Sequence, residues 1–301
     1  MTRVSERSRF EGTQLRVDTA KKYNDDVQQI AVSGRKLRHL SDDPAGSIRV
    51  FRNRTKLDNI AQFKKTADFA DGFLGKSEDS LRSLNDILIR ARELAVQLSN
   101  STYSESDRVA ASEEVRQLMG QVSTVGNSTY GDKYVFGGFR TSLPPISPDG
   151  TFCGDDGQIV LQFDESSFRA INISGRAVFD IEPQNESREL PLAKAVEHLY
   201  HGLVNNDLDS IRDSIGYLDK SITRVVNQTA TLGARRASFT DLQTRLAKAE
   251  EDLQADNNNI ESADPIQAAL DLKKADTTLQ FTLQSTAKML QPTLLNYLGN
   301  G

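Results

Sequence analysis

The sequence predicts a mainly α-helical protein. We expect a long antiparallel helical bundle or coiled-coil rod, made from the N-terminal and C-terminal halves of the chain, with a small β-rich inserted domain. The eight prolines leave residues 45–143 and 192–264 free of proline, and five of them fall between 144 and 191. A proline inside a helix costs about 3 kcal/mol, so the two proline-free stretches permit long helices. Apolar residues recur every three or four positions in both stretches, and the period changes between them.

The two long helices follow from two apolar rows. The first row runs from Ile60 to Leu98 with alternating spacings of three and four, and Ser77 is its only polar member. The second row begins at Leu208 and continues to Ile260. Sustained spacing of this kind forms the seam of a coiled coil or helical bundle. Gly233 lies within the second row, where we expect close packing against the partner helix because the row continues through it.

Shorter elements fill the middle of the chain. A third helix is predicted over about 106–129, where valine and leucine repeat at helical spacing. Three short runs rich in β-branched and aromatic residues follow, at 158–163, 168–173 and 176–181, with turn-forming residues between them. Such runs predict strands, and hence a small β insertion.

The domain organisation follows from this order of elements. We expect a terminal helical domain from residues 1–43 and 262–301, and a helical rod domain from residues 44–137 and 190–261. The β insertion then occupies residues 138–189.

The two ends of the chain carry opposite charge. Residues 1–56 hold 13 Lys or Arg against 7 Asp or Glu, a net charge of +6, and residues 250–301 hold 3 against 8, a net charge of −5. Both ends also carry apolar rows at helical spacing. The positions are Tyr23, Val27, Ile30, Leu37 and Leu40 near the start, and Leu279, Leu283, Leu290, Leu294 and Leu298 near the end. We expect the terminal helices to pair, with apolar burial supplying most of the energy. The alternative is two solvated, frayed tails.

A helix boundary is predicted near residue 44. Asp43 can accept hydrogen bonds from the first backbone N–H groups of a helix, and Pro44 suits the first helical position. The first terminal helix should therefore end near Leu40, and the next should begin at Pro44.

Composition excludes several classes of function. The net charge is −5 and the pI about 5.4, which argues against a nucleic-acid partner. Three His and one Cys exclude a Cys/His zinc site and a disulfide framework. His198 and His201 lack a third ligand, Cys153 lacks a paired His, and the Asp-Gly turns lack the pattern of a calcium loop. We expect no enzyme activity, no metal, no cofactor and no membrane insertion, and no cleavable secretory signal is visible.

Four stretches resemble one known family. The stretches Ser33–Lys36 with Ser41–Gly46, Ile89–Gln97, Tyr130–Gly138 and Leu294–Leu298 are together similar to the helical arms of the flagellin superfamily. The Tyr-x-Phe-Gly-Gly motif and the Leu-Leu-x-Tyr-Leu ending look more like the hook–filament junction branch, hook-associated protein 3, than like filament flagellin. The resemblance covers about residues 1–140 and 190–301.

The resemblance implies a structural protein of the bacterial flagellum. It would be exported through the flagellar type III apparatus without a cleaved signal, and would lie outside the cell in the junction layer. It would assemble with itself into a ring or short tube through its terminal helices. Implied partners are hook-associated protein 1 on the hook side, flagellin on the filament side and a cytoplasmic export chaperone before secretion.

The expected contact residues are the terminal apolar rows, with Leu295 and Tyr297 added at the C-terminal end. Arg90, Arg92 and Glu93 in the long-helix motif form a second candidate contact patch. Solvated charges on a helical rod are the alternative interpretation of these three.

Two other functions stay open at this stage. The first is filament flagellin itself, which would be present in thousands of copies rather than in one short layer. The second is a cytoplasmic coiled-coil adaptor, which would stay in the cell and keep its location after removal of residues 1–40.

Overall fold

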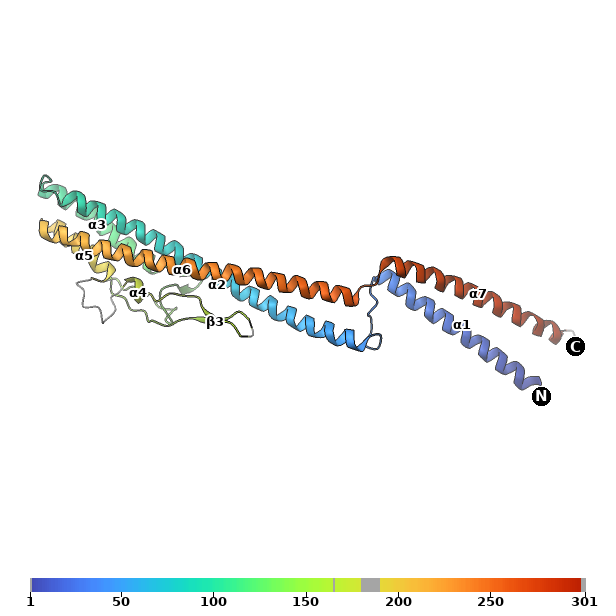
Figure 1. Ribbon diagram of the computed structural model, residues 1–301. Helices are drawn as coiled ribbons and strands as arrows, with labels where there is room; N and C mark the ends of the chain where they lie inside the picture. Colours follow the sequence, from blue (N-terminus) through green and yellow to red (C-terminus); the bar gives the residue numbers. More distant parts are fainter. Residues whose placement is uncertain (1, 165, 180–189, 299–301) are drawn as a thin grey trace. The chain divides into compact units, whose positions relative to one another are not determined.

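The computed structural model describes residues 2–164, 166–179 and 190–298, and the fold is mainly helical as predicted. The chain divides into two compact units. Unit 1 consists of Met1–Asp58 with Glu250–Gly301, and unit 2 consists of Asn59–Ala249. Two long helices, α2 (Pro44–Leu98) and α6 (Leu208–Glu261), contribute to both units. Figure 1 shows the order of the elements along the chain.

The core of unit 2 lies between α2 and α6. Fully buried residues on α2 recur every seven positions, as do those on α6, which confirms the two predicted seams. They are Ala67, Leu74, Leu81, Leu88 and Ala95 on α2, and Ile211, Leu218, Val225 and Leu232 on α6. Ser77 is also buried, and its hydroxyl donates to the carbonyl oxygen of Phe73 at 2.9 Å. The polar member of the row is therefore satisfied within its own helix.

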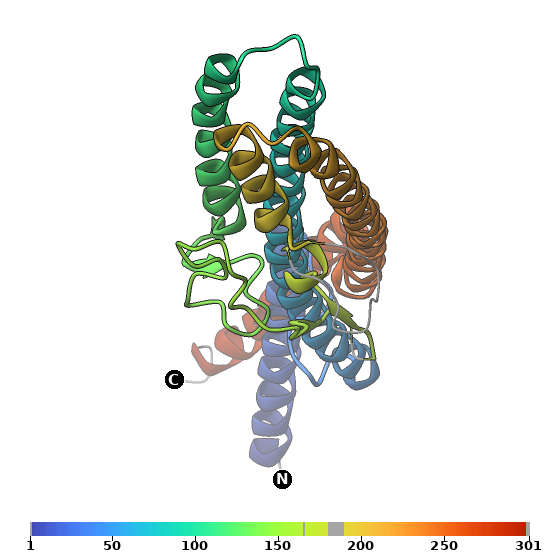
Figure 2. The same ribbon diagram turned by 90° about the vertical axis from the view of Figure 1, so that its left-hand side faces the viewer.

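Two shorter helices complete this core. The third predicted helix is α3 (Glu105–Gly126), which begins in a capping box made by Ser104 and Asp107. It packs along α5 (Leu192–Val204), and Figure 2 shows these two helices beside α2 and α6. Helix α3 ends three residues before the predicted limit, because the chain turns there into β1 (Thr129–Tyr130) and β2 (Lys133–Tyr134).

The predicted β insertion is only partly made of strands. Antiparallel strands β3 (Val160–Gln162) and β4 (Phe168–Ala170) pair with Leu161 opposite Arg169, so two of the three predicted strands are present in shortened form. The third prediction is wrong over 176–179, which form the short helix α4 (Arg176–Phe179). The backbone N–H groups of Val178 and Phe179 both donate to Gly175, which closes a helical turn there. The turn directs Phe179 into the core against Phe136, with ring centroids 5.3 Å apart. Residues 180 and 181 lie outside the described part.

The first terminal helix ends earlier than predicted. Helix α1 (Thr2–Ser33) stops at Gly34, whose φ of +68° takes the chain out of the helix. The prediction of an end near Leu40 is therefore wrong, and Leu37 and Leu40 lie in a non-helical connection. The start of α2 at Pro44 is confirmed, and Asp43 Oδ1 accepts the N–H of Gly46 at 2.9 Å.

The expectation for Gly233 is also wrong. This glycine is exposed on α6, and a Cβ built on it would meet nothing within 4 Å. The apolar row continues through Leu232, which is buried, whereas Gly233 sits on the adjacent solvent-facing side of the same helix.

Candidate assembly surface

The terminal helices form a pair within unit 1. Helix α1 lies along α7 (Pro265–Leu298), which confirms that the two ends of the chain meet (Figure 1). The contact buries Val27 on α1 and Ala268 and Ala275 on α7. Asn24, also buried, donates from Nδ2 to Asp276 Oδ1 at 2.7 Å. Two alanines let the helices approach closely, but they bury little apolar area, so the contact on its own is a modest source of stability.

Some of the predicted contact residues are covered by the α1–α7 pair, and others are exposed to solvent. Val27 is buried, and Ile30, Leu37 and Leu279 are half-buried. Tyr23, Leu40 and Leu283 are 49%, 75% and 44% exposed. Leu290, Leu294, Leu295, Tyr297 and Leu298 belong to α7, but their side chains lie outside the described part. Of the described positions in the two rows, only Val27 is therefore fully buried within this chain.

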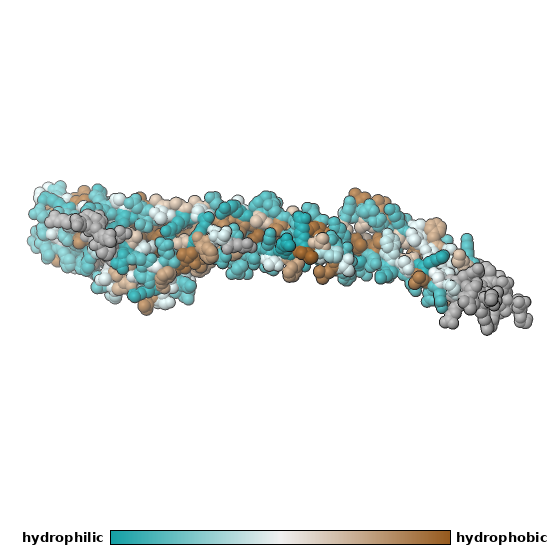
Figure 3. Space-filling view, turned by 60° about the horizontal axis from the view of Figure 1, so that its bottom comes forward, coloured by the Kyte–Doolittle hydropathy of each residue, from teal (hydrophilic) through white to brown (hydrophobic). Residues whose placement is uncertain are grey.

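Helix α7 carries a second apolar face that sequence analysis missed. Ile266, Leu270 and Phe281 are 73%, 53% and 67% exposed. Successive helical residues are 100° apart, so these three fall within about 60° of one another. Ala268 and Ala275, which face α1, lie on roughly the opposite side of the helix. A helix with apolar residues on two sides is typical of one buried from both sides. Figure 3 shows hydrophobic residues reaching the surface among hydrophilic ones.

Polar contacts within unit 1 join the connection between α1 and α2 to the connection between α6 and α7. Arg35 and Ser262 form an antiparallel bridge, and the neighbouring Lys36 N–H donates to the carbonyl oxygen of Glu261 at 2.8 Å. One turn into α2, Arg49 binds Asp256 through Nε and Nη2, at 2.9 and 2.7 Å. Buried Asn53 adds a third hydrogen bond to the same carboxylate, at 2.7 Å. The bidentate arrangement fixes the start of α2 against the end of α6.

The second candidate patch is engaged within unit 2. Arg90 Nε is 2.7 Å from Glu114 Oε1 on α3, and Arg90 Nη1 is 3.2 Å from Glu93 Oε2. The carboxylate of Glu114, and then that of Glu93, raise the pKa of the Arg90 guanidinium. Arg92 donates instead to Asp219 on α6. These side chains connect α2 to two neighbouring helices, and whether they also contact another subunit stays a prediction.

The residues considered for catalysis or metal binding have structural contacts. His198 Nδ1 is 3.1 Å from Ser214 Oγ, and His201 Nε2 is 3.8 Å from Glu197. Asp155 accepts the N–H groups of Phe139 and Gly157, at 2.7 and 2.8 Å, which is the role of a turn residue. Over the described ranges, we find no group of three His, Cys, Asp or Glu side chains placed to hold a metal ion. Nor does any helix there have the length and apolar character to cross a membrane.

The motif near the end of the N-terminal half has a packing explanation. Phe136 is fully buried, and Gly138 has a φ of +67°. A Cβ on Gly138 would lie 2.1 Å from Asp155 Oδ1 and 2.3 Å from the Asp155 carbonyl oxygen. The Phe-Gly-Gly sequence therefore inserts one ring into the core and turns the chain tightly against the 155–157 loop.

Paired terminal helices and a helical core, with a second apolar face exposed on α7, together define a mainly helical protein. Comparison with known proteins agrees with this class. Residues 10–141 match the bacterial flagellin N-terminal helical region, and residues 215–298 match the bacterial flagellin C-terminal helical region. The chain therefore belongs to the flagellin family of bacterial flagellar structural proteins.

Individual relatives fall into two groups. The flagellar filament 30.7 kDa core protein of Treponema maltophilum is 27% identical over 270 residues, which cover 89% of this chain and 88% of that protein. Flagellin of Listeria monocytogenes is 24% identical, with 91% of each chain covered. Among solved structures, a putative flagellar hook-associated protein of Vibrio parahaemolyticus has a TM-score of 0.67 at 16% identity, covering 73% of this chain and all of that one. FlgL of Bacillus cereus has a TM-score of 0.60 at 20% identity, covering 69% of this chain and 99% of that one.

Proposed function

We propose that this chain forms the junction layer between hook and filament of a bacterial flagellum. The observation that carries self-assembly is the double apolar character of α7. One side packs on α1, while Ile266, Leu270 and Phe281 stay exposed. Adjacent copies would bury this second face and repeat the contact around an axis to build a ring or short tube.

The junction role, rather than the filament role, is supported by two sequence motifs. The Tyr-Val-Phe-Gly-Gly stretch at 134–138 and the Leu-Leu-Asn-Tyr-Leu ending at 294–298 resemble hook-associated protein 3. In that role the layer would contact hook-associated protein 1 on one side and flagellin on the other. A cytoplasmic chaperone would hold the chain before export, and the chain would act outside the cell.

Filament flagellin is the second candidate function. It is favoured by the relatives that align along most of the chain, since the Treponema maltophilum and Listeria monocytogenes proteins are named as a filament core protein and a flagellin. Membership of the flagellin family leaves the cytoplasmic adaptor without support.

Deletion of the gene in its own bacterium separates the two functions. Loss of a junction protein should leave hooks without filaments while flagellin monomers appear in the medium. Immunogold labelling should place the protein as one band at the hook tip. Filaments that stay attached after deletion, or label along their whole length, would contradict the junction role.

Assembly of the purified chain tests the role of the second face of α7. Burying a phenylalanine side chain contributes about 1.5–3 kcal/mol, so Phe281→Ser should raise the concentration needed for assembly roughly 10- to 100-fold. Phe168→Ser is the matched control, because Phe168 is 62% exposed but lies on the β3–β4 hairpin of unit 2. Equal assembly by Phe281→Ser and the control would refute the assigned face.

A further inference from the structure

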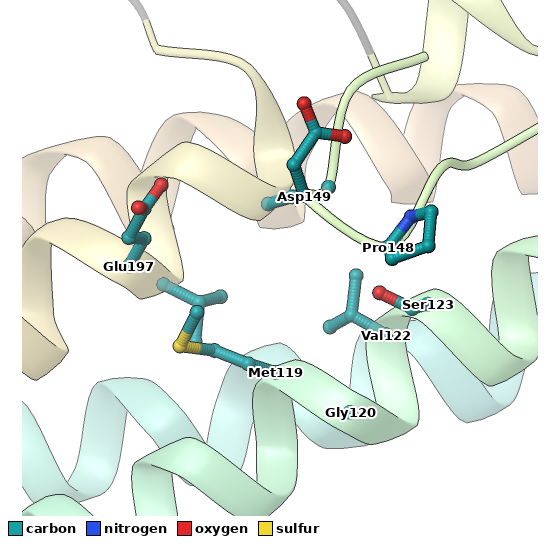
Figure 4. Close-up of a pocket in the computed structure, with 10 residues that line it drawn as sticks. Met119, Gly120, Val122, Ser123, Pro148, Asp149 and Glu197 are labelled. Carbon is teal, nitrogen blue, oxygen red and sulfur yellow. The ribbon is translucent and has the colours of Figure 1, made fainter. Parts of the chain in front are cut away.

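A cavity of about 260 Å³ lies within unit 2 between α3, the 148–150 loop and α5. Figure 4 shows Met119, Val122 and Ser123 pointing from α3 into the space between the loop and α5, with Asp149 and Glu197 on the side away from α3. Its remaining lining residues are Gly120, Pro148, Gly150, Ala193 and Val196. Small-molecule sites usually occupy about 300–1,000 Å³, so this cavity suits a single side chain better than a cofactor.

The base of the cavity is apolar. Val122 and Val196 are 1% and 0% exposed. Gly120 is exposed on α3, and a Cβ built on it would meet nothing within 4 Å, so this residue lies at the mouth of the cavity. The Ser123 hydroxyl has no hydrogen bond to any described residue, which leaves it able to accept one from a ligand.

The rim of the cavity carries an excess of negative charge. Asp149 accepts hydrogen bonds from Ser147 Oγ, from Thr151 Oγ1 at 2.8 Å and from the Thr151 N–H at 3.3 Å. These bonds lower the pKa of Asp149 to about 2, so the carboxylate is ionised at neutral pH. Glu197 pairs with Lys194 at 2.6 Å. One lysine therefore stands against two rim carboxylates.

We propose that this cavity is a socket for a lysine or arginine side chain of a second copy of this chain. The aliphatic stem would lie on Met119 and Val122, and the cationic head would sit between Asp149 and Glu197. The inference rests on the proposed assembly function, which brings copies of the chain side by side.

The basic first part of the chain can supply such a side chain. Arg52 and Lys56 are exposed and lie one turn apart on α2, and Arg52 directly follows Phe51, which is 74% exposed. Neither cation has a partner among the described residues. A cation flanked by an exposed aromatic ring complements an acidic rim around an apolar base, because both apolar burial and charge pairing favour the contact.

The socket can be tested by nuclear magnetic resonance on the full chain. The chain has three methionines, so a methyl-labelled sample gives a simple spectrum in which Met119 reports on the cavity. Arginine amide, added at constant ionic strength, should shift the Met119 methyl signal saturably and leave that of Met289 unchanged. Asp149→Asn with Glu197→Gln should weaken this binding at least tenfold.

Two further variants make this binding test specific. Asp132→Asn with Asp213→Asn removes the same charge from exposed positions elsewhere in unit 2 and should leave binding unchanged. Gly120→Leu should place a side chain at the mouth of the cavity and weaken binding without any change of charge. Absence of a saturable Met119 shift, or equal binding by all variants, would overturn the proposal.

An assembly experiment identifies the source of the cation. Asp149→Asn with Glu197→Gln should raise the concentration needed for assembly at least tenfold, and saturating arginine amide should inhibit the unmodified chain. If the unmodified chain assembles and neither change has an effect, a second copy does not fill the socket, although the assembly function stands. If the unmodified chain fails to assemble, that result contradicts the proposed assembly function, and it also removes the second copy as the occupant of the socket.

Discussion

Replacing Arg108 by methionine should loosen the end of unit 2 where α2 turns back into α3. Arg108 is 4% exposed, and its guanidinium donates three hydrogen bonds. Nε donates to the carbonyl oxygen of Leu98 at 3.1 Å, Nη2 to that of Asn100 at 2.9 Å, and Nη1 to Asn206 Oδ1 at 2.6 Å. One side chain thereby connects the end of α2, the following turn and the turn before α6.

The expected cost follows from these three bonds. A hydrogen bond from a charged group contributes about 1.5 kcal/mol at the low end of its range, so the three contribute about 4–5 kcal/mol. Methionine fills much of the same volume and does not require burial of a charge, which returns about 1–2 kcal/mol. The net loss should be about 3 kcal/mol, and it should be local because all three acceptors lie in neighbouring turns.

Hydrogen exchange measured by mass spectrometry is the suitable assay, because a chain with two compact units need not unfold in one step. Peptides covering residues 96–112 and 203–212 should exchange roughly 100-fold faster in Arg108→Met. Arg116→Met is the control on the same helix, since its ion pair with Glu113 is about 60% exposed on both sides. Exchange no faster than in the control would refute the assigned role of Arg108.

Three other predictions concern separate parts of the chain. Gly138→Ala should destabilise unit 2 by about 2 kcal/mol or more, because the φ of Gly138 is +67° and the new Cβ would lie 2.1 Å from Asp155 Oδ1. Thermal melting measures this effect, and the control Gly233→Ala, at an open helical site, should stabilise the chain by up to about 1 kcal/mol. Hydrogen bonds lower the pKa of Asp149 to about 2 in the folded chain, so its contribution to stability is present above about pH 4 and is lost as the pH falls towards 2. Asp149→Asn should therefore reduce the loss of stability between pH 4 and pH 2, and a carboxyl titration by nuclear magnetic resonance with a midpoint near 4 would contradict the prediction. Ala275→Leu should loosen the α1–α7 pair by about 1–3 kcal/mol, because residue 275 is 1% exposed against α1, and unchanged hydrogen exchange in α1 would show that the two helices are not in close contact there.

The long helices could be predicted because their signals are local and repeated. The seven-residue recurrence of buried positions on α2 and α6 appears in the sequence as spacings of three and four, and Asp43 with Pro44 gives the start of α2 correctly. The stretch at 176–181 could not be predicted in the same way. Its β-branched and aromatic composition favours a strand, whereas packing of Phe179 on Phe136 favours the helical turn that forms.

The candidate sites depended more on tertiary structure. The apolar row containing Val27 correctly indicated the contact of α1 with α7. The second face of α7 was present in the sequence as Ile266, Leu270 and Phe281, but it could be recognised only after the first face was seen to be occupied. The cavity beside Asp149 has no sequence signature, because its walls come from three segments separated by up to 78 positions in the chain.

By itself, the sequence determined the helical class, the seams of the long helices, the opposite charges of the two ends and the resemblance to the flagellin superfamily. These properties depend on spacing along one chain, and a helix repeats that spacing as a continuous stripe. Only the tertiary structure decided which apolar residues were already covered, which charges were already paired and where a cavity remained. Those properties depend on the neighbours that folding brings together, as Arg90 on Glu114 and Ala275 on α1 show.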